Sequence, residues 1–139
     1  MSVTSTRRTR VLVVDDERHI SRLLEFVLAK QGYQVKVANS GEQALATVDD
    51  FAPDVVLLDL VMPGISGLDV LKQLRSDGKH SDLKILVLSA HAFEHLPEEL
   101  KGAGASHLGN KPIAPSSLLK MLVDWGLPQY IPNSSPTGD

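Results

Sequence analysis

Chemically useful side chains follow four short, mostly apolar segments at widely separated positions. Asp15 and Asp16 follow the run VLVV, Asp59 follows VVLL, Ser89 follows ILVL, and Lys111 follows a short segment that contains glycine. If each segment is a parallel strand, the carboxyl ends of these strands lie on one edge of a sheet, where the five side chains converge. Three carboxylates this close together repel one another and require a cation. The sequence therefore predicts one cation-binding site with a hydroxyl and an ammonium group beside it.

The order of apolar segments predicts the sheet that would bring these groups together. Runs rich in Val, Ile and Leu alternate with segments of helical periodicity, a pattern typical of βαβ units with helices on both faces of a parallel sheet. We expect strands at residues 10–15, 33–38, 54–59, 83–89 and 106–110. The alternating composition of residues 33–38 is typical of an edge strand. The predicted fold class is α/β, with a doubly wound parallel sheet.

The predicted helices differ in how strongly the sequence supports them. The helix after the first strand is expected to bury Ile20, Leu23, Leu24, Val27 and Leu28. The last helix, residues 116–125, is expected to bury Leu118, Leu119, Leu122 and Val123. In the fourth helix, Pro97 fits only the first turn and Gly102 and Gly104 stop propagation, so about two turns remain. We expect mobility in that region.

Length and composition limit the function classes. The 139 residues make about one domain, with 42% hydrophobic residues, 22% charged residues and a net charge of -3. This charge predicts no nucleic-acid surface, and the absence of cysteine excludes disulfides and thiolate metal ligands. No apolar run approaches the roughly 18 residues of a membrane span, so we expect a cytoplasmic protein without membrane contact. We expect a disordered tail at 1–8, a folded domain at 9–126, and a tail or linker at 127–139.

The motifs together resemble the receiver domain of two-component response regulators, including the chemotaxis regulators. The resemblance rests on the acidic pair, the run DLVMPGISG at residues 59–67, the tripeptide LSA at 88–90, and the dipeptide KP at 111–112. It covers about residues 9–126. It implies a flavodoxin-like, five-stranded parallel sheet in the order 2-1-3-4-5 with five helices.

The resemblance also implies a metal site. Mg²⁺ would be held by Asp16, Asp59 and the backbone carbonyl of Val61, and Asp15 would join this group by orienting a bound water. Magnesium suits such oxygen ligands, whereas zinc would favour the His or Cys ligands that these strand ends lack. His91 and His95 have the spacing of helical metal ligands, but without a third ligand we expect them at the surface.

Roles for the remaining site residues follow from the same resemblance. Asp59 is the implied phosphoryl acceptor, and Lys111 would pair first with Asp59 and then with a phosphoryl oxygen. Ser89 would donate its hydroxyl to another phosphoryl oxygen. The bond from Lys111 to Pro112 is a candidate cis peptide.

One position departs from the family pattern and affects the expected switch. Leu108 stands three residues before Lys111, where the family usually has Tyr or Phe. Ser89 and Leu108 are the candidate switch residues, but leucine has no aromatic ring whose rotation could report phosphorylation. We therefore expect the output to come from rearrangement of the fourth helix.

The sequence thus predicts a signalling switch that accepts a phosphoryl group on Asp59 from a histidine kinase or a phosphotransfer protein. It would not be a metabolic enzyme and would catalyse only its own phosphorylation and dephosphorylation. Expected partners are an output protein or domain and a second copy, the latter through the fourth helix, fifth strand and fifth helix. The alternatives are a degenerate receiver that binds partners without phosphorylation and the receiver fragment of a larger regulator.

Two enzyme or carrier classes fit the sequence less well. A phosphatase with an aspartyl nucleophile commonly has a second acid two residues later, where this chain has Val61. A flavin or nucleotide carrier would need a phosphate-binding loop after the first strand, where Asp15 and Asp16 would repel phosphate.

Overall fold

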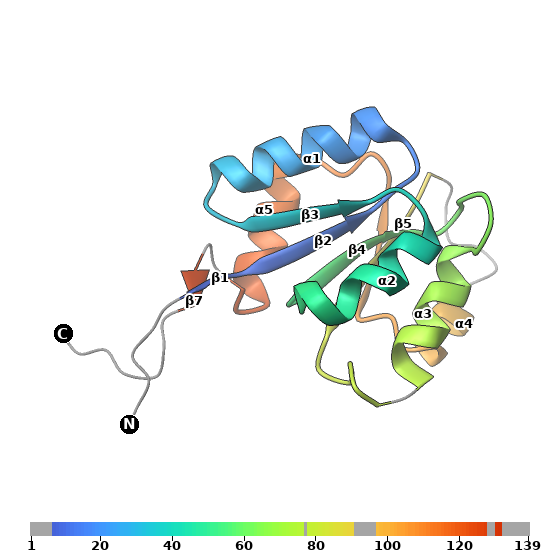
Figure 1. Ribbon diagram of the computed structural model, residues 1–139. Coiled ribbons are helices and arrows are strands. Elements are labelled where there is room, and N and C mark those ends of the chain that lie inside the picture. The colour runs from blue at the N-terminus through green and yellow to red at the C-terminus, as the bar shows by residue number, and fades with distance from the viewer. Residues whose placement is uncertain (1–6, 77, 91–96, 128–129, 132–139) are drawn as a thin grey trace, which may run out of the picture.

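The computed structural model describes residues 7–76, 78–90, 97–127 and 130–131 and has one main parallel sheet. Its five strands are β2 (Arg10–Val14), β3 (Gln34–Ala38), β4 (Val55–Asp59), β5 (Lys84–Ser89) and β6 (His107–Asn110). They lie in the order β3-β2-β4-β5-β6 (Figure 1), and every neighbouring pair is parallel. Counted along the chain this is the order 2-1-3-4-5, so the predicted fold is confirmed.

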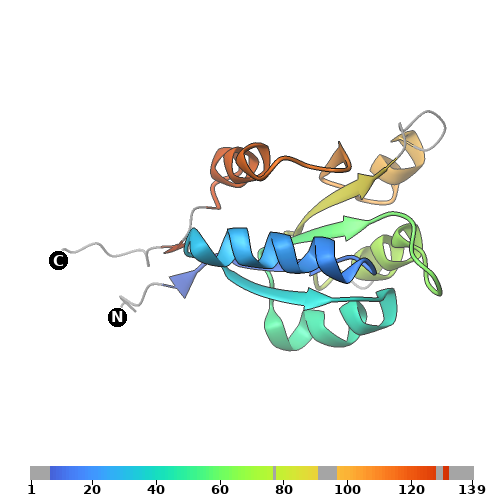
Figure 2. The ribbon, with the colours of Figure 1, turned by 90° about the horizontal axis from the view of Figure 1, so that it is seen from above.

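Helices cover both faces of the sheet. They are α1 (Arg18–Lys30), α2 (Gly41–Phe51), α3 (Gly67–Ser76), α4 (Pro97–Gly102) and α5 (Pro115–Asp124). The helices α1 and α5 lie on one face, and α2, α3 and α4 lie on the other (Figures 1 and 2). Within the described ranges, no helix is long and apolar enough to cross a membrane.

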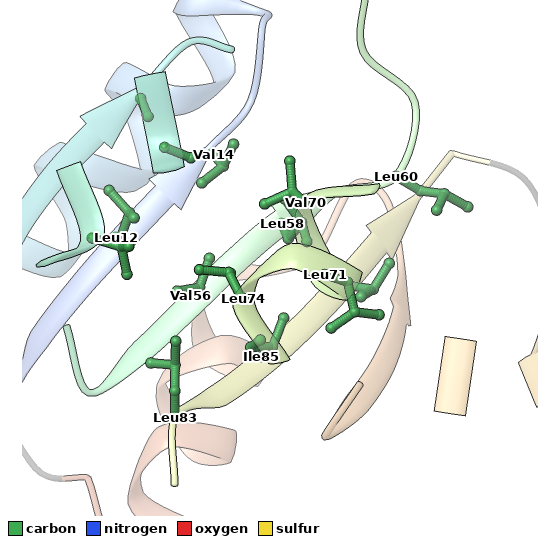
Figure 3. Packing of buried hydrophobic residues seen from close by; sticks show 14 of the residues in the cluster. Leu12, Val14, Val56, Leu58, Leu60, Val70, Leu71, Leu74, Leu83 and Ile85 are labelled. Carbon is green, nitrogen blue, oxygen red and sulfur yellow. The ribbon is translucent and has the colours of Figure 1, made fainter. Parts of the chain in front are cut away.

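The core has two halves because successive side chains of a strand point to opposite faces of the sheet. Val56 and Leu58 of β4 belong to the cluster that packs on α2, α3 and α4 (Figure 3). Leu57, between them, belongs to the cluster under α1 and α5. All five residues of β4 are buried, so Asp59 ends the strand at the centre of the sheet.

Two expected core residues are instead exposed. Leu23 of α1 is 53% exposed and Val123 of α5 is 55% exposed. Each helix buries a narrower stripe than predicted, because a residue next to a buried one is rotated by about 100° around the axis. In α1 the buried stripe consists of Ser21, Leu24 and Leu28. The predicted inward positions of Leu23 and Val123 were therefore wrong.

A second, two-stranded sheet brings together the regions predicted as tails. The strand β1 (Arg7–Arg8) pairs antiparallel with β7 (Tyr130–Ile131) (Figure 1). Leu127, just after α5, is also held, because the buried Tyr33 donates a hydrogen bond from its hydroxyl to the carbonyl of Leu127 at 2.9 Å. Each predicted tail thus contains a short paired strand, and the domain limits of 9–126 stay a prediction.

Gly67 allows α3 to begin directly against the end of the central strand. A Cβ atom at this position would lie 2.7 Å from Leu60 Cα and would also collide with the carbonyl oxygen of Asp59. The amide of Gly67 donates to the carbonyl of Leu60 at 2.9 Å, which closes the loop after Asp59. Glycine is therefore required sterically beside the candidate acceptor.

Substitution of this glycine should destabilise the fold. We expect Gly67→Ala to lower the free energy of unfolding by about 1 to 3 kcal/mol, because backbone atoms must shift to admit a methyl group. Urea unfolding monitored by circular dichroism would measure the change. Gly102→Ala is the matched control, because Gly102 has no atom within 4 Å of an added Cβ. Equal stabilities for the two variants would contradict the steric argument.

Candidate functional site

The acidic pair lies in the loop between β2 and α1, at the carboxyl edge of the sheet. Asp15 is buried, and its amide donates to the carbonyl of Ala38 at 3.1 Å, which continues the pairing of β2 with β3. Its Oδ1 atom accepts a hydrogen bond from the amide of Glu17 at 2.9 Å. Asp16 is only half-buried. The local backbone therefore holds the Asp15 carboxylate at the sheet edge.

Asp59 is buried as a residue but lies at the wall of a pocket. It is 6% exposed. The pocket has a volume of about 390 Å³ and is lined by Asp16, Glu17, Asp59, Val61, Ala90 and Lys111. The amide of Val61 donates to Asp59 Oδ1 at 3.4 Å. A small molecule can therefore reach this carboxylate through the pocket.

Three carboxylates converge here as the sequence predicts. Asp15, Asp16 and Asp59 each offer one oxygen atom, and these atoms lie within 4.8 Å of one another. The donor set is entirely oxygen, which suits a hard divalent cation such as Mg²⁺ and does not suit zinc. The residues present therefore fit the predicted metal. His91 and His95 lie outside the described residues.

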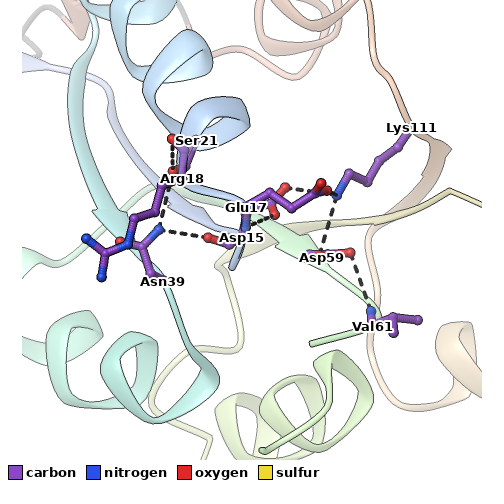
Figure 4. Close-up of polar contacts among 8 residues, drawn as sticks. All are labelled: Asp15, Glu17, Arg18, Ser21, Asn39, Asp59, Val61 and Lys111. Atoms are coloured by element: carbon purple, nitrogen blue, oxygen red, sulfur yellow. Dashed lines mark hydrogen bonds and ion pairs between the residues drawn. The ribbon is translucent and has the colours of Figure 1, made fainter. Parts of the chain in front are cut away.

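Lys111 places an ammonium group among the carboxylates (Figure 4). Its amide donates to the carbonyl of Ser89 at 2.7 Å, and its bond to Pro112 is cis, as the resemblance implied. The Nζ atom lies 3.0 Å from Asp15 Oδ2, 3.3 Å from Glu17 Oε1 and 3.4 Å from Asp59 Oδ2. The predicted contact between Lys111 and Asp59 is therefore present.

The crowding of charge shifts two pKa values. Burial raises the pKa of Asp59 to about 6, and the neighbouring Asp15 carboxylate adds to this, while Lys111 and the Val61 amide oppose it. For Lys111, burial disfavours the charged form, but its carboxylate neighbours outweigh burial and raise its pKa. The ammonium thus stays charged while Asp59 holds a proton more readily than an ordinary aspartate.

Ser89 and Leu108 occupy neighbouring strands. Ser89 is the last residue of β5 and is buried, and strand pairing sets it beside Asn110 of β6. Leu108 pairs with Val87 and packs, partly buried, against the core cluster under α2, α3 and α4. Ser89 therefore lies at the same sheet edge as Asp59, and Leu108 lies on the face that α4 covers. Their switch roles stay predictions.

Sequence reasoning missed two residues of the site. Glu17 joins Asp15 and Asp59 as a third carboxylate beside Lys111. Asn39 donates its side-chain amide to the carbonyl of Asp15 at 2.9 Å and to the Ser21 hydroxyl at 3.3 Å (Figure 4). Glu17 directly follows the acidic pair, which was an available signal. Asn39 had no comparable signal beyond its place at the end of a predicted strand.

Comparisons with known proteins agree with this geometry. The response regulator receiver domain family matches residues 11–123. The response regulator MprA of Mycolicibacterium vanbaalenii is 43% identical over 112 residues, which are 79% of this chain and 47% of MprA. This chain thus spans about half the length of the curated relatives it matches.

Solved structures show the same fold. The chemotaxis protein CheY4 of Vibrio cholerae superimposes with a TM-score of 0.80 at 32% identity, over 84% of this chain and 98% of CheY4. The response regulator TrrA of Thermotoga maritima, solved in complex with Mg²⁺ and BeF, gives a TM-score of 0.72 at 36% identity, over 84% of this chain and 97% of TrrA. Sequence, sheet order and the acidic cluster agree: the chain belongs to the response regulator receiver domain family of two-component signalling.

Proposed function

We propose that Asp59 is the phosphoryl acceptor of this receiver and that the donor is a histidine kinase or a phosphotransfer protein. The observation that carries the proposal is the position of Asp59. Its carboxylate ends the central strand, lines an open pocket, and lies 3.4 Å from the Lys111 ammonium with two further aspartates beside it. Phosphoryl transfer depends mainly on positioning and charge stabilisation, and this pocket supplies both.

The transfer exchanges one bond to phosphorus for another. The P–N bond to the donor imidazole breaks as a P–O bond to an Asp59 carboxylate oxygen forms. The electron pair of the broken bond stays on the imidazole nitrogen, which takes a proton from solvent. Lys111 binds a phosphoryl oxygen after transfer, because an ammonium beside an anion makes a charge-assisted hydrogen bond. Ser89 donates its hydroxyl to another phosphoryl oxygen.

The acidic cluster would hold Mg²⁺. The proposed direct ligands are Asp16, Asp59 and the main-chain carbonyl of Val61, and Asp15 would orient a water bound to the ion. The three aspartates have the clustered carboxylate oxygens described above. When bound, Mg²⁺ supplies positive charge that offsets the negative charge of the carboxylates and the phosphoryl group.

The protein would act as a cytoplasmic switch that catalyses only its own phosphorylation and dephosphorylation. We propose that phosphorylation moves Ser89, that Leu108 fills part of the space vacated, and that α4 rearranges as a result. The changed surface of α4, β6 and α5 would then bind an output protein, an output domain or a second copy of the chain. Phosphorylation-independent binding by a degenerate site is less well supported, because the acceptor, the acidic pair and the lysine converge.

Removal of the acceptor carboxylate should abolish labelling. Acetyl phosphate or beryllofluoride with Mg²⁺ should modify the wild type at Asp59, and Asp59→Asn should remain unmodified. Intact-mass spectrometry would measure the phosphoryl group, and peptide mapping would locate it. Asp82→Asn is the control, because Asp82 is an exposed aspartate remote from the pocket lining. Equal labelling of wild type and Asp59→Asn would refute the acceptor assignment.

Magnesium should stabilise the fold through the acidic cluster. A ligand at ten times its dissociation constant raises the free energy of unfolding by about 1.4 kcal/mol, and the melting temperature should rise by several degrees. Asp16→Asn should lose most of this increase because it removes one ligand of the site. Differential scanning calorimetry with and without MgCl₂ would measure the effect. No response of the wild type at millimolar Mg²⁺ would favour a degenerate site.

The raised pKa of Asp59 predicts a pH dependence of stability without metal. The folded-state pKa of about 6 exceeds the ordinary value of 3.8. The resulting stabilisation is therefore fully present below about pH 4 and is lost as the pH rises through about 6. Relative to Asp59→Asn in EDTA, the wild type should lose on the order of 1 kcal/mol across this window, after allowance for screening by water in the pocket. Urea unfolding at several pH values would measure it, and identical pH profiles would contradict the prediction.

A further inference from the structure

Glu17 occupies a helix-capping position without acting as a side-chain cap. It is the N-cap residue of α1, with extended backbone angles of φ -83° and ψ 102°, and its side chain makes no capping hydrogen bond. Helix N-caps are usually Ser, Thr, Asp or Asn, because a short side chain can accept a hydrogen bond from the first turn. The Glu17 carboxylate is therefore available for a contact elsewhere in the fold.

That contact is with Lys111, 94 residues away. Glu17 Oε1 lies 3.3 Å from Lys111 Nζ (Figure 4). The main chain of Glu17 is tied to the same group of residues, since its amide donates to Asp15 Oδ1 at 2.9 Å. In the resting protein, one ammonium group is thus shared by Asp15, Glu17 and Asp59.

Glu17 differs from the other two carboxylates in its exposure. Its side chain is 51% exposed, whereas those of Asp15 and Asp59 are nearly fully buried. It also lines the pocket that leads to Asp59. Exposed ion pairs are weak, so the pair with Glu17 is the most easily broken of the three ion pairs that Lys111 makes. The Glu17 carboxylate also adds negative charge where a phosphoryl donor must approach.

We propose that Glu17 is a positioning residue that shares Lys111 in the resting protein and keeps the mouth of the pocket negative. The inference rests on the proposed function. Its negative charge should lower the rate of phosphorylation and raise the affinity for Mg²⁺. Glu17 slows phosphorylation by anionic donors, because it repels them and draws Lys111 toward the rim. The same charge favours binding of Mg²⁺, because it attracts the divalent cation and takes up part of the competing Lys111 charge.

Glu17→Gln tests both effects, because it removes the charge with little change in shape. The initial rate of Asp59 phosphorylation by acetyl phosphate would be measured at saturating Mg²⁺. In this reaction the P–O bond to acetate breaks, acetate leaves with the electron pair, and a P–O bond to Asp59 forms. The Mg²⁺ dissociation constant would be measured separately by calorimetry without a donor. We expect the initial rate and the Mg²⁺ dissociation constant each to rise about two- to fivefold, a size that suits an exposed ion pair.

Glu25→Gln provides the matched control. It makes the same charge change within α1, the helix that Glu17 precedes. Glu25 is exposed and lines a different groove with Arg22, Phe26 and Lys30. The rate and the dissociation constant of this variant should remain at wild-type values. Raising the salt concentration should shrink the difference between wild type and Glu17→Gln, because ions screen exposed charges.

The outcomes separate this inference from the proposed function. Normal labelling of the wild type at Asp59, with Glu17→Gln unchanged in both quantities, would overturn the role of Glu17 and leave the acceptor assignment intact. A slower rate together with weaker Mg²⁺ binding would also overturn it, because such losses indicate a structural role. No labelling of the wild type at Asp59 would overturn both proposals.

Discussion

The crowding of like charges at one edge of the sheet is the constraint on which the site depends. Asp15, Asp16 and Asp59 have oxygens within 4.8 Å of one another, and Lys111 is the ammonium group that contacts two of the three. Such a cluster is unfavourable without added positive charge, and the raised pKa of Asp59 reflects both its burial and a neighbouring carboxylate. The same repulsion makes the site receptive to a divalent cation. The fold has to hold together groups that would otherwise separate.

The rest of the structure supplies that restraint. The strand β4 is buried along its whole length between the two halves of the core, so Asp59 cannot move away from the sheet edge without disturbing packing on both faces. Backbone hydrogen bonds hold Asp15 to β3 and Lys111 to β5. Parallel strand order then brings residues almost a hundred positions apart into contact. Hydrophobic burial therefore offsets the electrostatic cost of the acidic cluster.

The sequence could predict the features that follow from local periodicity and from the residues at strand ends. The family resemblance implied the order of the sheet. The convergence of Asp59 with Lys111 was predicted because parallel topology places every strand end on one edge. Sequence reasoning was wrong about Leu23, because the width of a buried stripe depends on how a helix sits against its neighbours. It missed Glu17, whose partner is 94 residues away and depends on the direction of a long side chain. Tertiary placement, which propensity does not encode, determines such contacts.

The switch has to amplify a small local change. A hydrogen bond to a charged group contributes about 1.5 to 3 kcal/mol, whereas reversing a population from 1:99 to 99:1 takes about 5.5 kcal/mol. A single bond from Ser89 to a phosphoryl group is therefore insufficient. In the proposed mechanism Lys111 would contribute further, because it would exchange carboxylate partners for a more highly charged phosphoryl group. The helix α4 has only six residues, too few for stability without packing, so a modest loss of contacts at its face would shift its position. Its buried Leu100 joins α4 to the core cluster that also contains β5 residues Ile85 and Val87, so in the proposed mechanism a change near the end of β5 would reach this helix through packing.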